Sequence, residues 1–234
     1  GEASEDEFVQ AMVGADTDLQ KSIIFTKGAS GSEYREIGDQ VILDVRNIEL
    51  IDKKEGVARL KDINFIVREG EIFGIAGVTG NGQSELGEVL MGIQKPTSGE
   101  IHYLGEPCKE TTRELLDDGF TYIPEDRIED GYLPKANVAQ NIILGAHTRE
   151  PYSRKKFIDW KNIYNITREL IQEYNIKTSG PEEAAGNLSG GNIQRVMIAR
   201  AFSQRCKLMV AQSPTRGLDI ASIDFVYKKL FTSK

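Results

Sequence analysis

Glycines and a serine precede a predicted helix in the stretch "GVTGNGQSEL", residues 77–86. Their spacing nearly matches the pattern G-x-x-x-x-G-K-[ST], in which backbone N–H groups and the closing hydroxyl hold nucleotide phosphates. Gln83 stands where that pattern has lysine, and glutamine keeps a hydrogen-bond donor but removes a positive charge. The stretch therefore predicts either a weakened phosphate site or a structural turn. The candidate site residues are Gly77, Gly80, Asn81, Gly82, Gln83, Ser84 and Glu85.

A second stretch, "NLSGGNIQRVMIARAF" at residues 187–202, starts with a serine and paired glycines and continues as an apolar helix. Backbone N–H groups and the positive end of the dipole at a helix start favour anions. The alternative is an ordinary helix N-terminus, in which the serine only caps the helix. The candidate residues here are Leu188, Ser189, Gly190, Gly191 and Asn192.

A third stretch, "KLMVAQSPTRGLDI" at residues 207–220, is an apolar strand that ends in a polar turn. In phosphate-cleaving enzymes such a turn often holds a Mg²⁺-binding carboxylate and a general base. The three stretches together therefore indicate nucleotide chemistry more strongly than any one of them.

These stretches resemble the nucleotide-binding domain of ABC transporters, over residues 41–234. "LSGGN" resembles the signature motif, and "PTRGLD" resembles the segment between the Walker B strand and the D-loop. "FTYIPEDRIEDGYL", residues 120–133, is similar to the Q-loop region of sugar and nucleoside importers. The resemblance implies an α/β fold: a P-loop NTPase (ABC ATPase) core with a mainly parallel sheet, an antiparallel β subdomain and a helical subdomain.

The departures from the family pattern lie on the Walker side. Gln83 replaces the Walker A lysine, and Gln212 and Ser213 stand at the strand-end acidic pair, unless a one-residue slip places Ala211 and Gln212 there. Glu125 stands at the Q-loop glutamine. We therefore expect no catalytic residue to be intact.

Other parts of the Walker side are also incomplete. "IDKKEGVARL" offers no aromatic residue to stack on adenine, and the switch histidine of the family would lie past Lys234. The hydroxyl of Ser84 is the one remaining Mg²⁺ ligand that the resemblance implies, and it would bind weakly. Arg127 is either an ion-pair partner of Asp126 or Glu125, or part of a coupling surface.

The signature side, by contrast, is complete at Ser189, Gly190 and Gly191, and so is the D-loop residue Asp219. In this family an ATP site combines the Walker motifs of one domain with the signature motif of another. The resemblance thus implies that this chain completes the ATP site of an upstream domain in the same parent chain. Its own site would bind ATP and Mg²⁺ weakly.

The same resemblance implies partners and a location. They are an integral membrane permease and, indirectly, a substrate-binding protein, with the domain peripheral on the cytoplasmic face of the cell membrane. Whether the substrate is a sugar or a nucleoside stays open, although "GNGQSEL" favours the nucleoside-type branch.

The elements that must position these residues follow from hydrophobic periodicity. Residues 1–40 predict the tail of a preceding domain and a linker, and 41–234 predict the domain itself. Two antiparallel strands within 41–73 should lead into a buried strand ending at Gly77, and a helix should follow the glycines. Residues 137–178 predict helix within a helical insertion near 134–185, with Trp160 and its neighbours in the core.

Composition narrows the alternatives. The chain has 234 residues, a net charge of −7 and two cysteines without ligand-like spacing, which predicts no nucleic-acid partner, disulfide framework or zinc site. No apolar run approaches the roughly 18 residues of a membrane span. The alternatives are a soluble ABC-type ATPase, a purely regulatory ABC domain and a dinucleotide-binding oxidoreductase. The last lacks its third glycine, because Glu85 stands there.

Overall fold

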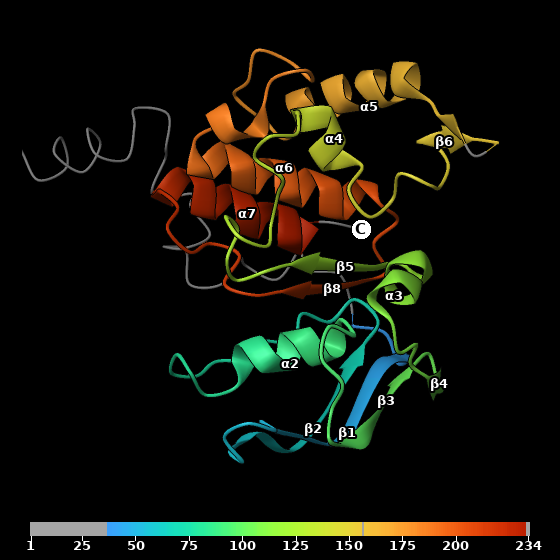
Figure 1. Cartoon of the computed structure of the whole chain (residues 1–234), viewed down its shortest axis with the longest axis vertical. Helices are drawn as coiled ribbons and strands as arrows, with labels where there is room; N and C mark the ends of the chain where they lie inside the picture. Colours follow the sequence, from blue (N-terminus) through green and yellow to red (C-terminus); the bar gives the residue numbers. More distant parts are fainter. Residues whose placement is uncertain (1–36, 156, 233–234) are drawn as a thin grey trace, which may run out of the picture.

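The computed structural model describes residues 37–155 and 157–232 of the chain. The predicted tail and linker in residues 1–40 therefore lie almost entirely outside the described residues. Figure 1 shows an antiparallel sheet at one end, helices at the other and a short parallel pair of strands between them.

The antiparallel sheet has the strand order β2-β1-β3-β4, and its strands alternate between side chains that face the core and side chains that face solvent. Its members are β1 (Val41–Ile51), β2 (Ala58–Arg68), β3 (Ser98–Tyr103) and β4 (Glu106–Pro107). The buried face packs against α2 (Gln83–Leu90), the helix that follows the glycine-rich loop. The predicted antiparallel β part is confirmed, and it extends to β4.

The prediction of a buried strand ending at Gly77 is wrong. Residues 71–77 form no strand, and Ile72 and Ile75 are 58% and 51% exposed. Among the described residues, β5 (Phe120–Ile123) and β8 (Leu208–Ala211) pair only with each other, and residues 71–77 pair with neither. An apolar run becomes a buried strand only where a neighbouring strand satisfies its backbone N–H and C=O groups.

The helical half contains the helices that the sequence predicts, with one interruption. Its members are α4 (Val138–Ile142), α5 (Trp160–Glu173), η2 (Ala185–Asn187), α6 (Gly190–Ser203) and α7 (Ile220–Thr232). The continuous helix expected over 137–178 is wrong. α4 ends at Ile142, turns occupy residues 143–152, and the hairpin of β6 (Ser153–Arg154) and β7 (Phe157–Ile158) precedes α5, which ends at Glu173. Pro151 lies just before this hairpin, and proline removes a backbone donor that a helix would need.

Side chains next to the first turn cap several helices at their N-termini. Thr111 accepts a hydrogen bond from the backbone of Glu114 at the start of α3 (Thr112–Asp118). Asn137 forms a capping box with Gln140 at the start of α4, and Asp159 caps α5. Such caps satisfy backbone N–H groups that have no partner within the helix, so these starts are encoded locally.

The parallel pair β5–β8 lies between the two halves, with Phe120 opposite Leu208 and Ile123 opposite Ala211. Parallel strands end on the same edge of a sheet, so the residues after β5 and β8 meet there. α2 contacts both β2 and β8, and Figure 1 shows it between the parallel pair and the antiparallel sheet.

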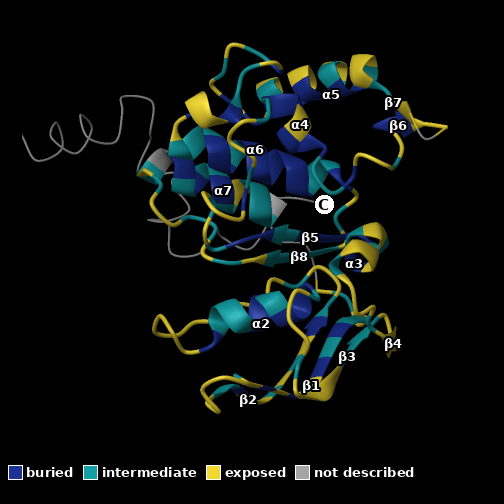
Figure 2. Cartoon of the chain, in the orientation of Figure 1, coloured by how far each residue is buried: buried dark blue, intermediate teal, exposed yellow. Residues whose placement is uncertain are grey.

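The largest buried cluster joins α4, α5, α6 and α7. Figure 2 shows buried residues concentrated where α4 and α6 face each other. Ile142, Ile163 and Ile198 in this cluster are each 0% exposed, so the helical half has a continuous apolar core.

Ile163→Ala should lower the free energy of unfolding by about 3 kcal/mol, because it leaves a cavity in a close-packed site. Chemical denaturation followed by circular dichroism measures the change. Ile128→Ala is the matched control, since this side chain is 64% exposed and its loss should cost less than about 0.5 kcal/mol. Equal losses in the two variants would contradict the packing described here.

Candidate functional site

The glycine-rich loop takes backbone angles that favour glycine. Gly80 and Gly82 have φ values of 90° and 96°, in the left-handed region. Gly82 also lies against β2, where an added Cβ would come within 2.6 Å of the Arg59 carbonyl oxygen. Gly82 is therefore required both by its conformation and by the close approach of the backbone.

Gln83 folds its side chain back over this loop. Its Nε2 donates to the carbonyl oxygen of Val78 at 3.4 Å. A Cβ added to Gly77 would lie 2.1 Å from the same nitrogen, so the amide covers that glycine directly. The loop thus holds a neutral amide of its own chain.

Ser84 connects the start of α2 to the segment after β5. Its hydroxyl donates to Oε2 of Glu125 at 2.5 Å, and Oε1 of Glu125 accepts from Arg216 at 2.9 Å. The Arg216 side chain is 67% exposed and that of Glu125 is 31% exposed, so water screens the pair and its contribution to stability is small. Its chemical consequence is larger, because both carboxylate oxygens are engaged.

Gln212 ties the end of β8 to α2. Its Nε2 donates to the carbonyl oxygens of Gln83 and Ser84, each at 3.0 Å, and its Oε1 accepts from the Tyr122 hydroxyl. Burial raises the pKa of Tyr122 to about 12. Gln212, which stands where the family resemblance implies a carboxylate, is therefore a structural bridge among β8, α2 and β5.

The donor set does not fit Mg²⁺, which prefers several hard oxygen ligands in an octahedron. The hydroxyl of Ser84 faces Glu125, and Glu125 faces Arg216. The side-chain oxygen of Gln212 is taken by Tyr122. Over residues 37–155 and 157–232, no three His, Cys, Asp or Glu side chains gather in a way that would hold a metal ion. The arginine supplies the positive charge at this position.

The remaining residues predicted on the Walker side are Asn81, Glu85 and Ser213. Asn81 is exposed and donates its backbone N–H to Val78. Glu85 lies in the first turn of α2, where its charge adds to burial in raising the pKa of Glu88. Ser213 is exposed in the turn after β8, with φ 43°. None of them adds positive charge to the loop.

The segment before α6 exposes its polar groups. Leu188 is 8% exposed and anchors the segment, whereas Ser189, the N-cap of α6, is exposed. The Ser189 hydroxyl accepts from Nδ2 of Asn192 at 2.8 Å, and Oδ1 of Asn192 accepts from the Lys177 backbone at 2.8 Å. The asparagine thus holds the serine in place, and the serine side chain makes no hydrogen bond to the backbone of the helix start.

Asp219 and the paired glycines lie next to each other. A Cβ on Gly191 would lie 3.8 Å from Oδ2 of Asp219. Asp219 accepts from the backbone N–H of Ser222 at 2.8 Å, which lowers its pKa and caps α7. The structure therefore brings Asp219 and the start of α6 together across a separation of almost thirty residues.

The main contacts of Arg127 are with backbone carbonyl oxygens and not with the carboxylate of Asp126 or Glu125, so the ion-pair alternative is wrong. Its guanidinium donates to the carbonyl oxygens of Arg216 at 2.8 Å and Gly217 at 3.4 Å. A Cβ on Gly190 would lie 2.9 Å from the same guanidinium. Arg127 and Arg216 thus link the two glycine-rich segments, a role that no local spacing indicates.

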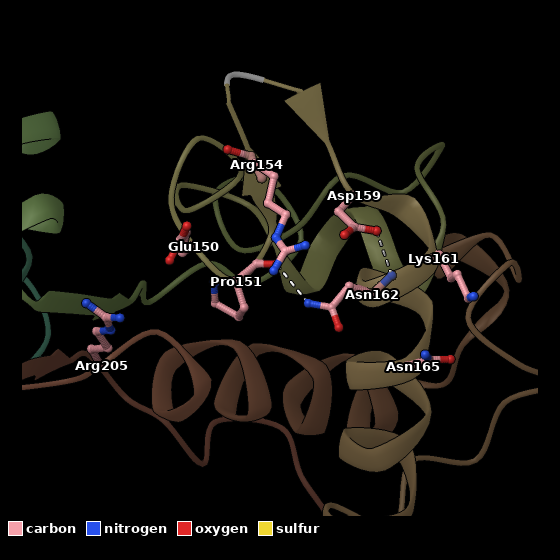
Figure 3. Close-up of a pocket in the computed structure, with 9 residues that line it drawn as sticks. Glu150, Pro151, Arg154, Asp159, Lys161, Asn162, Asn165 and Arg205 are labelled. Carbon is pink, nitrogen blue, oxygen red and sulfur yellow. Dashed lines mark hydrogen bonds between the residues drawn. The ribbon is translucent and has the colours of Figure 1, made fainter.

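A separate hollow lies away from both glycine-rich segments and has a volume of about 560 Å³ (Figure 3). It contains none of the residues predicted for nucleotide binding. Its walls are formed by Glu150, Pro151, Ser153, Arg154, Asp159, Lys161, Asn162, Asn165 and Arg205.

Comparisons with known proteins identify relatives by sequence. Residues 60–216 match the family described as ABC transporter. The chain is 31% identical over 235 residues to the nucleoside import ATP-binding protein NupA of Lactococcus lactis subsp. cremoris. It is 35% identical over 236 residues to the guanosine import ATP-binding protein NupO of Bacillus subtilis. Both matches cover 100% of this chain but 44% of the relative's length.

Solved structures agree on the fold. A nucleotide-free ATP-binding cassette of an ABC transporter superposes with a TM-score of 0.67 and 21% identity, covering 81% of this chain and 76% of that one. A cassette bound to ADP and Pi gives 0.67 and 22% identity, covering 81% and 82%. The predicted P-loop NTPase (ABC ATPase) fold is confirmed. Within the described residues, no helix is long and apolar enough to cross a membrane.

Tyr122→Phe should reduce the loss of stability at alkaline pH. In the folded chain the pKa of Tyr122 is about 12, above the ordinary 10.0, so its neutral form stabilises the fold below pH 10.0. That stabilisation is lost as pH rises towards 12. Urea denaturation at several pH values above 9 should therefore show a shallower decline in Tyr122→Phe than in the wild type. Identical slopes would show that burial of this phenol does not contribute.

Proposed function

This chain belongs to the ABC transporter family, and from that premise we propose that it is an ATP-binding domain of an importer for a nucleoside or a simple sugar. The importer assignment is supported by relatives named as import ATP-binding proteins, for nucleosides, guanosine and ribose. The two nucleoside-type relatives cover 100% of this chain and the ribose relative covers 97%, so the choice between a nucleoside and a sugar stays open.

The observation that carries the mechanism is the contrast between the two glycine-rich segments. On the Walker side, the loop is covered by Gln83 and the adjacent carboxylate is paired with Arg216. On the signature side, Ser189 is the exposed N-cap of α6, and its side chain makes no hydrogen bond to the helix backbone. We propose that this domain donates its signature segment to an ATP site that another domain completes.

The domain's own Walker site is proposed to hydrolyse ATP poorly. It lacks the lysine that neutralises charge on the transferred phosphoryl group, and the end of β8 offers Gln212 and Ser213 in place of carboxylates. Each such loss typically costs about 10² to 10⁴ in rate. Hydrolysis would therefore depend on the other site.

The remaining parts of the proposal concern assembly. The partner domain would lie upstream in the same parent chain, and the chain described here spans 44% of the length of the relatives named above. An integral membrane permease and a substrate-binding protein would complete the importer, and the domain would sit peripherally on the cytoplasmic face of the membrane. Co-purification with such a permease would separate this function from a soluble ABC-type ATPase.

Ser189→Arg in the complete transporter should reduce ATPase activity at least about 100-fold, because a bulky cation at the helix start blocks the shared site. Gln83→Ala should change it less than about twofold, since that loop does not perform the chemistry. Steady-state phosphate release measures both. Glu182→Arg introduces the same side chain at another exposed position and is the control for charge. Equal losses in Ser189→Arg and Gln83→Ala would contradict the division of roles.

ATP should bind the 234-residue chain with a Kd in the tens of micromolar or weaker, and with little dependence on Mg²⁺. The guanidinium of Arg216 already neutralises Glu125, so removing Mg²⁺ with EDTA should change the Kd less than about twofold. Arg216→Ala frees the carboxylate and should make binding Mg²⁺-dependent, whereas Arg216→Lys should not. Fluorescent-nucleotide titration tests this, and a Mg²⁺-dependent Kd below about 1 μM would contradict it.

A further inference from the structure

The hairpin β6–β7 presents apolar side chains to solvent. Phe157 is 80% exposed, Ile158 is 41% exposed, and Trp160 at the start of α5 is 38% exposed. The expectation that Trp160 lies in the core is therefore wrong, although Ile163 one turn later is buried. A group of exposed aromatic and aliphatic side chains on one hairpin is typical of a surface that contacts a membrane or another molecule.

This projection is anchored firmly at its base. Tyr152 is 2% exposed, and its hydroxyl lies 3.4 Å from that of Ser203 on α6. Ser153 donates its hydroxyl to the Thr148 carbonyl at 3.0 Å, and the backbone N–H of Asp159 donates to Tyr152 at 2.9 Å. Figure 1 shows the hairpin projecting from the edge of the helical half, beyond the start of α5. The exposed tip is thus held out by buried contacts.

Basic residues surround the apolar tip. The sequence from 154 to 161 contains four basic residues and one acidic residue, in a chain whose net charge is −7. Arg154, Lys155 and Lys161 are exposed. The acidic residue, Asp159, accepts a hydrogen bond from the backbone of Asn162 at 3.0 Å as the cap of α5. The local charge is therefore opposite to that of the whole chain.

The polar hollow of about 560 Å³ lies directly behind this tip. Three of the residues that line it are cationic: Arg154, Lys161 and Arg205. Figure 3 shows the Arg154 side chain extending over Pro151 towards Asn162, within the hollow. Glu150 and Asp159 are on its wall as well, so three cationic side chains face two carboxylates. A zwitterionic or anionic group with phosphate oxygens fits such a lining.

We propose that the hairpin and the basic residues beside it bind the surface of an anionic lipid membrane. Phe157 and Trp160 would enter the boundary between headgroups and acyl chains, where aromatic rings are favoured. Arg154, Lys155 and Lys161 would contact headgroup phosphates, the arginine over the hollow. Exposed apolar side chains next to exposed basic ones match the acyl boundary and the anionic headgroups of a membrane, which favours a lipid partner.

Sedimentation of the 234-residue chain with lipid vesicles tests the proposal. Without nucleotide and at low salt, the chain should bind vesicles of equal parts phosphatidylcholine and phosphatidylglycerol and should not bind phosphatidylcholine alone. Added salt should weaken binding, because it screens the charges. Failure to bind the anionic vesicles, or equal binding to both compositions, would overturn the proposal. Since no nucleotide is present, that failure would leave the proposed role in ATP binding untouched.

Variants locate the contact. Arg154→Glu combined with Lys161→Glu should weaken binding to the anionic vesicles at least about 25-fold, since each basic residue near the surface contributes about fivefold. Phe157→Ser should weaken it several-fold, and Phe157→Trp should preserve it. Lys53→Glu with Lys54→Glu, in the exposed turn between β1 and β2, changes the net charge equally and should have little effect. Equal losses in the two charge-reversed pairs would show that net charge, not this surface, governs binding, and would overturn the proposal.

Discussion

The side chain of Gln212 is the contact on which the arrangement of the Walker side depends. Gln212 directly follows β8, and its side-chain amide bonds to the first turn of α2 and to the phenol of Tyr122 on β5. Gly87 makes this approach possible, because a Cβ there would lie 2.2 Å from the amide nitrogen. A carboxylate at the same position would repel the two carbonyl oxygens that the amide now binds. The amide at position 212 therefore fixes the start of α2 against β5 and β8.

The polar side chains around the glycine-rich loop are neutral or paired within the chain. Gln83 covers Gly77, and Glu125 is shared between a serine hydroxyl and Arg216. Each polar group here finds its partner within the chain, which stabilises the loop in the absence of a ligand. The start of α6 differs, because Ser189 is exposed and Asn192 orients it without covering the helix end. The two segments therefore differ in whether their hydrogen-bonding capacity is already used.

Polar contacts nevertheless connect these segments. Ser84 meets Glu125, Glu125 meets Arg216, and Arg127 meets the backbone of Arg216 beside Gly190. Gln212 adds rigidity at one end, and the cap of α7 by Asp219 adds it at the other.

The sequence alone determined the features that depend on neighbouring residues. The helix start at Asn137, the glycine loop before α2 and the paired glycines before α6 were predicted, since caps and glycine conformations are local. The start of α5 at Asp159 was missed, although its cap is local too. Only the tertiary structure decided the partners of the polar side chains. The pairs Ser84–Glu125 and Glu125–Arg216 span 41 and 91 positions, and they meet because β5 and β8 run parallel and end on one edge. Residues 71–77 form no strand. An apolar run indicates a tendency to be buried, but a strand also needs hydrogen-bond partners for its backbone, and these come from other parts of the fold.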